Sequence, residues 1–221
     1  MILLLIFLLV DPVEFGNYLF ERGEYRDAII EYRRAIFIGH PDTIRILLNI
    51  GRTYFKLEEY KEVRETLQKM NSDTANAIIV LSYFCEKLLD SAKIFIQKIK
   101  SKELKDNLLS EEESLKKLKY RKPILAGLLS AILPGLGRVY ADRPGDACFG
   151  FIFTVSTGFG AYHYFRENNL YFAIPMGVAT LLFYLGDVYG SVASTKIYNE
   201  TLYNKKLGEI LRAYTELLEP E

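Results

Sequence analysis

The sequence predicts an all-α protein in which paired helices in water are followed by a transmembrane helical hairpin. Two observations support this prediction. Small and aromatic residues recur at a spacing of 35 from residue 16 to residue 51. Charged residues number 40 over residues 11–122 but only 7 over residues 123–195. The first pattern is typical of a helical repeat array and the second of lipid-facing segments, because charge is costly inside a bilayer.

The composition excludes several classes of protein. The chain has 221 residues with 28 basic and 28 acidic side chains. It therefore lacks the basic excess that is typical of a nucleic-acid-binding protein. Half of the residues are apolar, which excludes an intrinsically disordered chain. The chain has two cysteines, Cys85 and Cys148, which are far apart in the sequence, and two histidines. These are too few for a disulfide framework or a metal centre. No phosphate-binding loop or nucleophile–base pair is evident, so we expect a non-enzyme without cofactor or metal.

Residues 1–10, MILLLIFLLV, are wholly apolar. Ten residues rise only about 15 Å as a helix, half of a hydrocarbon core, so they do not span a membrane alone. The length is typical of the apolar region of a secretory signal peptide, although a basic start and an A-x-A cleavage site are missing. We expect an export signal or anchor; the alternative is a buried first helix.

Residues 11–99 contain three related units. The first reads Gly16-x6-Gly23-x-Tyr25-x2-Ala28-x3-Tyr32-x2-Ala35. The second reads Gly51-x2-Tyr54-x5-Tyr60-x2-Val63-x3-Leu67-x2-Met70, and the third, weaker one reads Tyr83-x5-Leu89-x2-Ala92-x3-Ile96-x2-Ile99. The pattern resembles the tetratricopeptide repeat, a pair of antiparallel helices of about 34 residues. Glu58 stands where glycine is usual in that family.

The resemblance implies a concave groove, lined by the first helix of each unit, that holds a peptide or helix of another protein. By position, the groove residues are Asn17, Phe20, Glu21, Arg45, Leu48, Arg52, Phe55, Lys56, Leu81 and Phe84. Arg45, Arg52 and Lys56 share one helical face, and this basic stripe suits an acidic partner group. The alternative is an ordinary solvated helix face. Residues 100–122 predict a charged helix that caps the stack and ends in a basic cluster typical of lipid headgroup contact.

Residues 123–195 contain three apolar stretches, at residues 123–137, 145–165 and 170–191. The last two are long enough to cross a bilayer, whereas the first is marginal and either crosses or is re-entrant. A P-G-x-G-x-x-Y-x-x-R motif lies between a short and a longer apolar helix, at Pro134, Gly135, Gly137, Tyr140 and Arg143. It resembles the two-span membrane-hairpin domains that often follow repeat modules in bacterial envelope proteins. The resemblance, over residues 122–199, implies anchoring and an assembly role without catalysis.

Charged residues near this motif predict ion pairing close to lipid. Arg138, in place of the usual glutamine or histidine, lies within nine residues of Asp142, Arg143 and Asp146. Asp187 follows a charge-free run, and we expect it to pair with Arg138 or Arg143 across the hairpin. The alternatives are an unpaired interfacial carboxylate and a proton or ion pathway.

Gly186 and Gly190 place small residues on one helix face, which favours close helix packing within the hairpin or, alternatively, a homo-oligomer. Residues 196–221 predict an amphipathic helix that either folds back on the repeats or lies on the membrane. We expect a membrane-anchored interaction scaffold or assembly factor at the bacterial inner membrane. The leader favours periplasmic repeats, whereas the basic clusters favour cytoplasmic ones. The alternative function is a transport-accessory or channel-like component with the repeats as docking cap.

Overall fold

The computed structural model of the chain describes residues 11–220, so the predicted signal or anchor at residues 1–10 lies outside the described residues. The described part is all-α and contains no strand. It divides into two compact units, which we call the repeat unit (residues 11–117 with 206–220) and the apolar unit (residues 118–205). The C-terminal residues therefore belong to the same unit as the predicted repeats.

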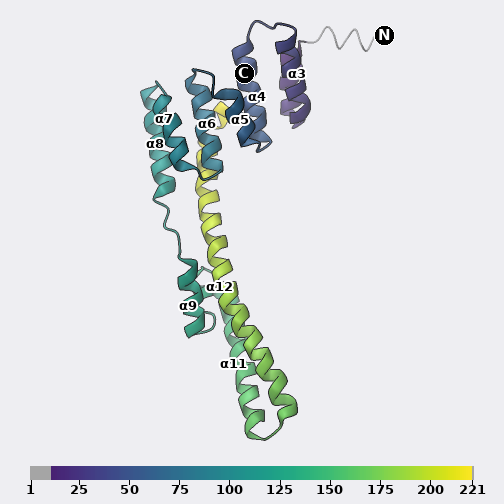
Figure 1. Ribbon diagram of the computed structural model, residues 1–221, viewed down its shortest axis with the longest axis vertical. Coiled ribbons are helices and arrows are strands. Elements are labelled where there is room, and N and C mark those ends of the chain that lie inside the picture. Colours follow the sequence, from purple (N-terminus) through teal and green to yellow (C-terminus); the bar gives the residue numbers. More distant parts are fainter. Residues whose placement is uncertain (1–10, 221) are drawn as a thin grey trace, which may run out of the picture. The chain divides into compact units, whose positions relative to one another are not determined.

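The repeat unit consists of helices that pack in sequence-adjacent pairs (Figure 1). In chain order the helices are α2 (Pro12–Glu21), α3 (Tyr25–Phe37), α4 (Thr43–Lys56), α5 (Tyr60–Leu67), α6 (Asp73–Cys85), α7 (Leu89–Lys98) and α8 (Lys102–Lys116). The pairs are α2 with α3, α4 with α5, and α6 with α7, and α8 packs against α7. This arrangement is repeat-like, as the spacing of small residues predicts.

The 35-residue spacing has a direct physical cause in the packing of the first two pairs. A Cβ atom on Gly16 would lie 2.6 Å from the Tyr32 ring, and one on Gly51 would lie 2.6 Å from the Leu67 side chain. Each glycine therefore lets a large residue of the following helix reach its backbone. Aromatic pairs repeat as well, because Phe20–Tyr25 and Phe55–Tyr60 both meet edge to face at 5.2 and 5.4 Å.

The turns within the pairs also correspond. Gly23 has a φ of +78°, and the equivalent Glu58 and Lys87 have φ values of +61° and +62°. A left-handed residue after a helix satisfies its last carbonyl groups, and glycine adopts it without strain. Glu58 thus keeps the turn although it lacks the usual glycine.

Gly51→Val is expected to destabilise the repeat unit by about 1–3 kcal/mol, because the added side chain would overlap Leu67 in a packed core. The thermal midpoint followed by circular dichroism at 222 nm measures the loss. Gly208→Ala is the matched control, since a Cβ atom there meets nothing within 4 Å. Alanine in a helix interior should leave stability unchanged or raise it. An equal loss in both variants would contradict the packing argument.

The connection before α8 is held by the carboxylate of Asp73 at the start of α6. It accepts hydrogen bonds from the backbone N–H groups of Lys100 and Ser101 at 2.9 and 2.8 Å. These bonds favour the charged form, so they lower the pKa of Asp73. Ser101 in turn caps α8 through the N–H of Leu104. The helix predicted within residues 100–122 is therefore α8, which ends at Lys116.

The apolar unit contains the remaining helices and begins after Lys117. These are α9 (Pro123–Ile132), α10 (Leu136–Tyr140), α11 (Pro144–Arg166) and α12 (Leu170–Ala213), of which α12 continues into the repeat unit. A 3-10 turn, η1 (Thr215–Leu218), follows α12. The predicted 123–137 stretch is thus not one helix, because it breaks between α9 and α10. The amphipathic C-terminal residues continue α12 without interruption as far as Ala213.

Helices α11 and α12 run side by side and are joined by a short turn (Figure 1). Thr180 donates a hydrogen bond to Thr157 at 3.0 Å, and the Phe153 and Phe183 rings lie 5.4 Å apart. Within residues 11–220, α12 alone is long and apolar enough to cross a membrane, and α11 falls short of that measure. Glycine, hydroxyl residues and His163 lower the hydropathy of α11.

Both helices expose large apolar side chains. These include Phe149, Ile152, Phe159, Tyr162, Phe165, Tyr171, Leu181 and Leu182, each more than half exposed. So many exposed large apolar side chains on two neighbouring helices are unusual for a protein surrounded by water. It is consistent with membrane association of the apolar unit.

Candidate functional site

Two clusters contain many of the residues that the sequence singled out. One surrounds Asp187 in the apolar unit, and the other surrounds Arg52 in the repeat unit. Each lies wholly within its own unit.

The first cluster begins with the turn between α9 and α10. Gly135 has a φ of +91°, and a Cβ atom there would lie 2.6 Å from the carbonyl oxygen of Ala147. A Cβ atom on Gly137 would collide with the carbonyl oxygen of Ala126 in α9. Both positions therefore require glycine, one for its backbone conformation and both for close approach. Pro134 precedes this turn.

The carboxylate of Asp187 on α12 closes this turn. It accepts a hydrogen bond from the Gly135 N–H at 2.6 Å and another from the Arg138 Nε–H at 2.8 Å. Asp187 is only 1% exposed, and the Arg138 side chain is 24% exposed. Of the alternatives that the sequence left open, the structure thus shows pairing with Arg138. A buried carboxylate is tolerated because a cation and a backbone donor both compensate it.

Small residues on the neighbouring helices make room for this ion pair. A Cβ atom on Gly150 of α11 would lie 2.6 Å from a carboxylate oxygen of Asp187, and one on Gly190 would press on the Arg138 guanidinium. Gly190 therefore packs within the unit. A Cβ atom on Gly186 would meet nothing within 4 Å. Gly186 instead borders a cavity of about 290 Å³, whose walls include Asp187, Arg138 and Phe149.

Two serines complete the cluster, and the motif did not predict them. The hydroxyl groups of Ser130 on α9 and Ser191 on α12 lie 2.7 Å apart, and the Ser130 hydroxyl accepts the Gly137 N–H at 3.1 Å. Both serines are fully buried. The available signal was the position of Ser191 one helical turn after Asp187, which places both on the same face of α12.

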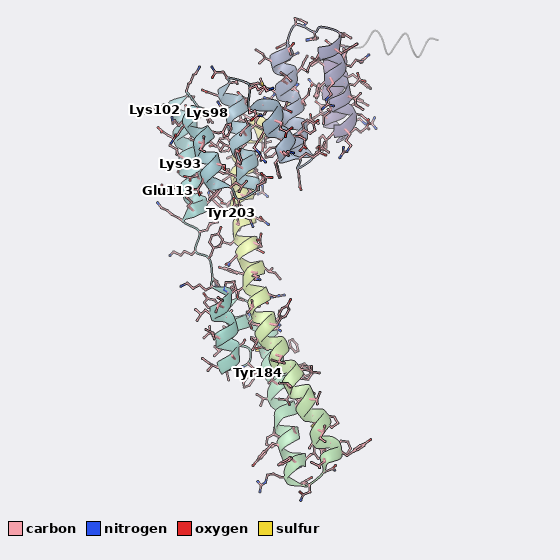
Figure 2. All side chains as sticks on the ribbon, in the orientation of Figure 1. Lys93, Lys98, Lys102, Glu113, Tyr184 and Tyr203 are labelled. Atoms are coloured by element: carbon pink, nitrogen blue, oxygen red, sulfur yellow. The ribbon has the colours of Figure 1, made fainter. Side chains whose placement is uncertain are left out.

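The other charged residues of the motif lie nearer the surface. Arg143 pairs with Asp146 at 2.9 Å, and both side chains are at least two-fifths exposed. Asp142 adopts a positive φ of +66° after α10. The Tyr140 hydroxyl accepts the Lys122 N–H at 3.1 Å, so Tyr140 ties α10 to the start of α9. Figure 2 labels Tyr184, whose hydroxyl on α12 donates to the Ala131 carbonyl oxygen of α9 at 2.8 Å.

The second cluster is built around the basic residues of α4. Arg52 is 1% exposed, and its Nη1 group donates to Asn49 at 2.8 Å. Asn49 donates to Asn17 at 3.2 Å, and the Tyr32 hydroxyl donates to the same Asn17 oxygen at 2.7 Å. Burial raises the pKa of Tyr32, so its hydroxyl remains a donor. This network joins α2, α3 and α4 and fixes the direction of Arg52.

The C-terminal residues of the chain occupy this cluster. The Nε group of Arg52 donates to the carbonyl oxygen of Leu217 at 2.9 Å, and Lys56 pairs with Glu219 at 2.7 Å. Leu218 is 5% exposed, and η1 packs against α6. Of the two alternatives for the C-terminal residues, the structure thus shows that residues 206–219 fold back on the repeat unit. We call residues 214–219 the tail.

The last turns of α12 secure the beginning of the tail. Lys206 pairs with Glu111 of α8 at 3.0 Å, and Ile210 is only 1% exposed. Beside the tail lies a cavity of about 330 Å³, whose walls include Phe55, Tyr60, Leu211 and Leu218. The cavity offers apolar space next to the basic residues Lys56 and Arg212.

The remaining predicted groove residues are distributed differently. Phe20, Leu48, Leu81 and Phe84 are buried in the repeat unit, and Lys56 lies over the Phe20 ring at 5.6 Å. Arg45 pairs with Asp42 at 3.3 Å at the first turn of α4, and Glu21 is exposed. The structure therefore brings Arg52, Phe55 and Lys56 together beside the tail, whereas Arg45 has its own partner.

The Cys85 thiol and the metal-ligating side chains offer no further site in the part of the chain described by the structure. Burial raises the pKa of the Cys85 thiol to about 11, so it stays protonated at neutral pH. Among residues 11–220, no three histidine, cysteine or acidic side chains form a group that could hold a metal ion. Comparison with known protein families, with curated proteins and with solved structures finds no match for this chain.

Proposed function

We propose that the protein is a membrane-anchored interaction scaffold or assembly factor of the bacterial envelope, whose tetratricopeptide-like repeats hold a segment of another protein. The observation that carries the proposal is the tail bound at Arg52 and Lys56. A backbone carbonyl group, a leucine and a carboxylate of a short segment are each held by α4 or its neighbours. Peptide recognition in a groove requires these kinds of contact.

The proposed anchor is a helical hairpin of α11 and α12 in the bacterial inner membrane, with the repeats on the periplasmic side. The exposed apolar side chains of both helices support membrane insertion. The buried Asp187–Arg138 pair supports it as well, because it lowers the cost of two charges near lipid. The apolar leader in the sequence supports the periplasmic side over the cytoplasmic one.

Vesicle flotation tests the anchor. The purified chain, reconstituted from detergent into phospholipid vesicles, should float with them and resist extraction by carbonate. The double variant Phe159→Asp with Leu182→Asp should lose most flotation, because both side chains are exposed on the hairpin. Phe37→Asp is the matched control, since Phe37 is 90% exposed in the repeat unit. The anchor is refuted if the double variant floats like the control.

Partner capture tests the scaffold. Crosslinking of the tagged chain in the membranes of its own cells should give a defined adduct that Lys56→Glu abolishes. Lys61→Glu, which changes an exposed residue paired with Glu65 across one turn of α5, should keep the adduct. A Lys56→Glu variant with an undiminished adduct would exclude the groove as the binding surface.

A transport-accessory or channel-like role is the second candidate. The cavity beside Asp187 supports it, because an ionisable residue next to a space in a membrane segment suits an ion or proton path. Proton or ion flux through reconstituted vesicles that Asp187→Asn abolishes would favour this role. Flux that is absent from the wild type would exclude it.

A further inference from the structure

The tail is held as a ligand is held in a binding site. Leu218 supplies the buried apolar group, the Leu217 carbonyl oxygen accepts from Arg52, and the Glu219 carboxylate meets Lys56. The three contacts come from three consecutive residues. Such a set is a short linear motif, a leucine followed by a carboxylate, which other chains are able to carry.

The arginine of the binding site is also held by contacts that do not involve the tail. Arg52 is oriented by Asn49, and Asn49 is connected through Asn17 to Tyr32, all of them within the helix pairs. Lys56 lies one turn further along the same helix. Because these residues sit on a rigid helix, the site remains formed when the tail leaves. A preorganised site of this kind favours binding, since little ordering is needed.

The tail itself is short, and one of its three contacts is partly exposed. It forms a 3-10 turn of four residues, and its ion pair to Lys56 is partly exposed, with 28% and 47% of the two side chains accessible. Exposed ion pairs contribute little to stability. Residues 206–213 hold the tail near the site through Lys206 and Ile210. Tethering gives the tail an effective concentration on the order of millimolar, and an incoming segment must overcome it.

On the basis of the proposed function, we propose that the tail is a built-in competitor and that the partner carries a leucine followed by a carboxylate. In the resting chain the tail covers Arg52 and Lys56. The partner segment displaces it by making the same three contacts. The 330 Å³ cavity is walled on one side by Phe55 and Tyr60 and on the other by Thr215 and Leu218 of the tail, so it widens when the tail leaves. A further apolar side chain of the partner can then lie against Phe55 and Tyr60, which gives that segment an advantage over the tail.

Fluorescence anisotropy of a labelled peptide tests the proposal on the full chain in detergent. The probe is AYTELLEP, the sequence of residues 213–220. The open variant carries Glu219→Lys in the chain, which repels the tail from Lys56. It should bind the probe at least tenfold more tightly than the wild type. If the open variant and the wild type bind the probe equally, the tail is not a competitor.

A charge exchange identifies the site of binding. Lys56→Glu in a chain that keeps Glu219 also repels the tail, so this variant should bind AYTELLKP and should not bind AYTELLEP. Lys61→Glu added to the open variant is the control and should change neither. Circular dichroism checks that each variant is folded. Probe binding that does not change with Lys56→Glu overturns the proposal. The proposal is also overturned if the wild type forms a concentration-dependent dimer that Glu219→Lys dissociates, because the tail would then bind a second copy of the chain.

The outcomes separate this proposal from the proposed function. Failure of the probe to bind the open variant, with flotation and the Lys56-dependent adduct intact, refutes the tail as competitor but leaves the scaffold. If the wild type neither floats with vesicles nor gives the crosslinked adduct, the membrane-anchored scaffold is refuted, regardless of how the probe binds.

Discussion

Asp187→Ala is expected to destabilise the apolar unit by about 3–5 kcal/mol, the usual cost of removing one partner from a buried ion pair. The substitution leaves the Arg138 guanidinium and the Gly135 N–H group without their acceptor. The Gly135 N–H group is buried, and the Arg138 side chain is only 24% exposed. Water therefore compensates them poorly, and the turn between α9 and α10 should detach from α12.

Thermal unfolding in detergent, followed by circular dichroism at 222 nm because the chain has no tryptophan, measures this effect. Asp146→Ala is the matched control. It removes a carboxylate that is also paired with an arginine, but at an exposed position, so the loss should stay below about 1 kcal/mol. Combining Asp187→Ala with Arg138→Leu should recover part of the stability, because no buried charge is then left unpaired. Equal losses for Asp187 and Asp146 would contradict the structural role of the pair.

The sequence identified Asp187, Arg138 and the glycines of this cluster, but it did not identify Ser130 and Ser191 or all of the bonds. Proline and glycine at residues 134–137 indicated a tight turn, and the isolated charge of Asp187 indicated a partner across the helices. Whether Asp187 pairs with Arg138 or with Arg143 depends on where α10 ends, and the residue pattern of the sequence does not show the end of that helix. The bond from the Gly135 N–H to Asp187 was also beyond prediction, because every residue except proline carries the same backbone donor.

The repeat unit was predictable as far as its small residues determine the packing. Gly16 and Gly51 each contact a large residue 16 positions later. The 35-residue spacing of the two glycines therefore reflects the close packing of each helix pair. The position of the tail was not predictable. An amphipathic pattern shows that one face of a helix is buried. It does not show whether the repeat unit or a membrane surface covers that face.

The groove prediction included residues that belong to the core. Phe20, Phe55 and Phe84 occupy corresponding places in the three units and are 3%, 6% and 0% exposed. The resemblance assigned them to the groove because they lie on the first helix of each unit. Their neighbours Asn17 and Arg52 belong to the hydrogen-bonded network beneath the tail. A helix only 10–14 residues long thus supplies both core and groove from adjacent positions.

Phe84→Ala should therefore destabilise the repeat unit by about 3–5 kcal/mol, the cost of a large cavity in a packed core. Phe84→Leu, which keeps most of the apolar volume, should lose much less. Phe37→Ala is the control, because a side chain that is 90% exposed should change stability by no more than about 0.5 kcal/mol. Chemical denaturation followed by circular dichroism measures all three variants.

The same experiment decides between a core and a groove role for Phe84. A groove residue would leave the unfolding midpoint nearly unchanged when truncated, and the loss would instead appear in binding of AYTELLEP to the open variant. A core residue lowers the midpoint, and under conditions where Phe84→Leu remains folded the probe should still bind. The hydrogen bond and the ion pair of the tail come from Arg52 and Lys56 on α4, so both should survive a change at Phe84 that the fold tolerates.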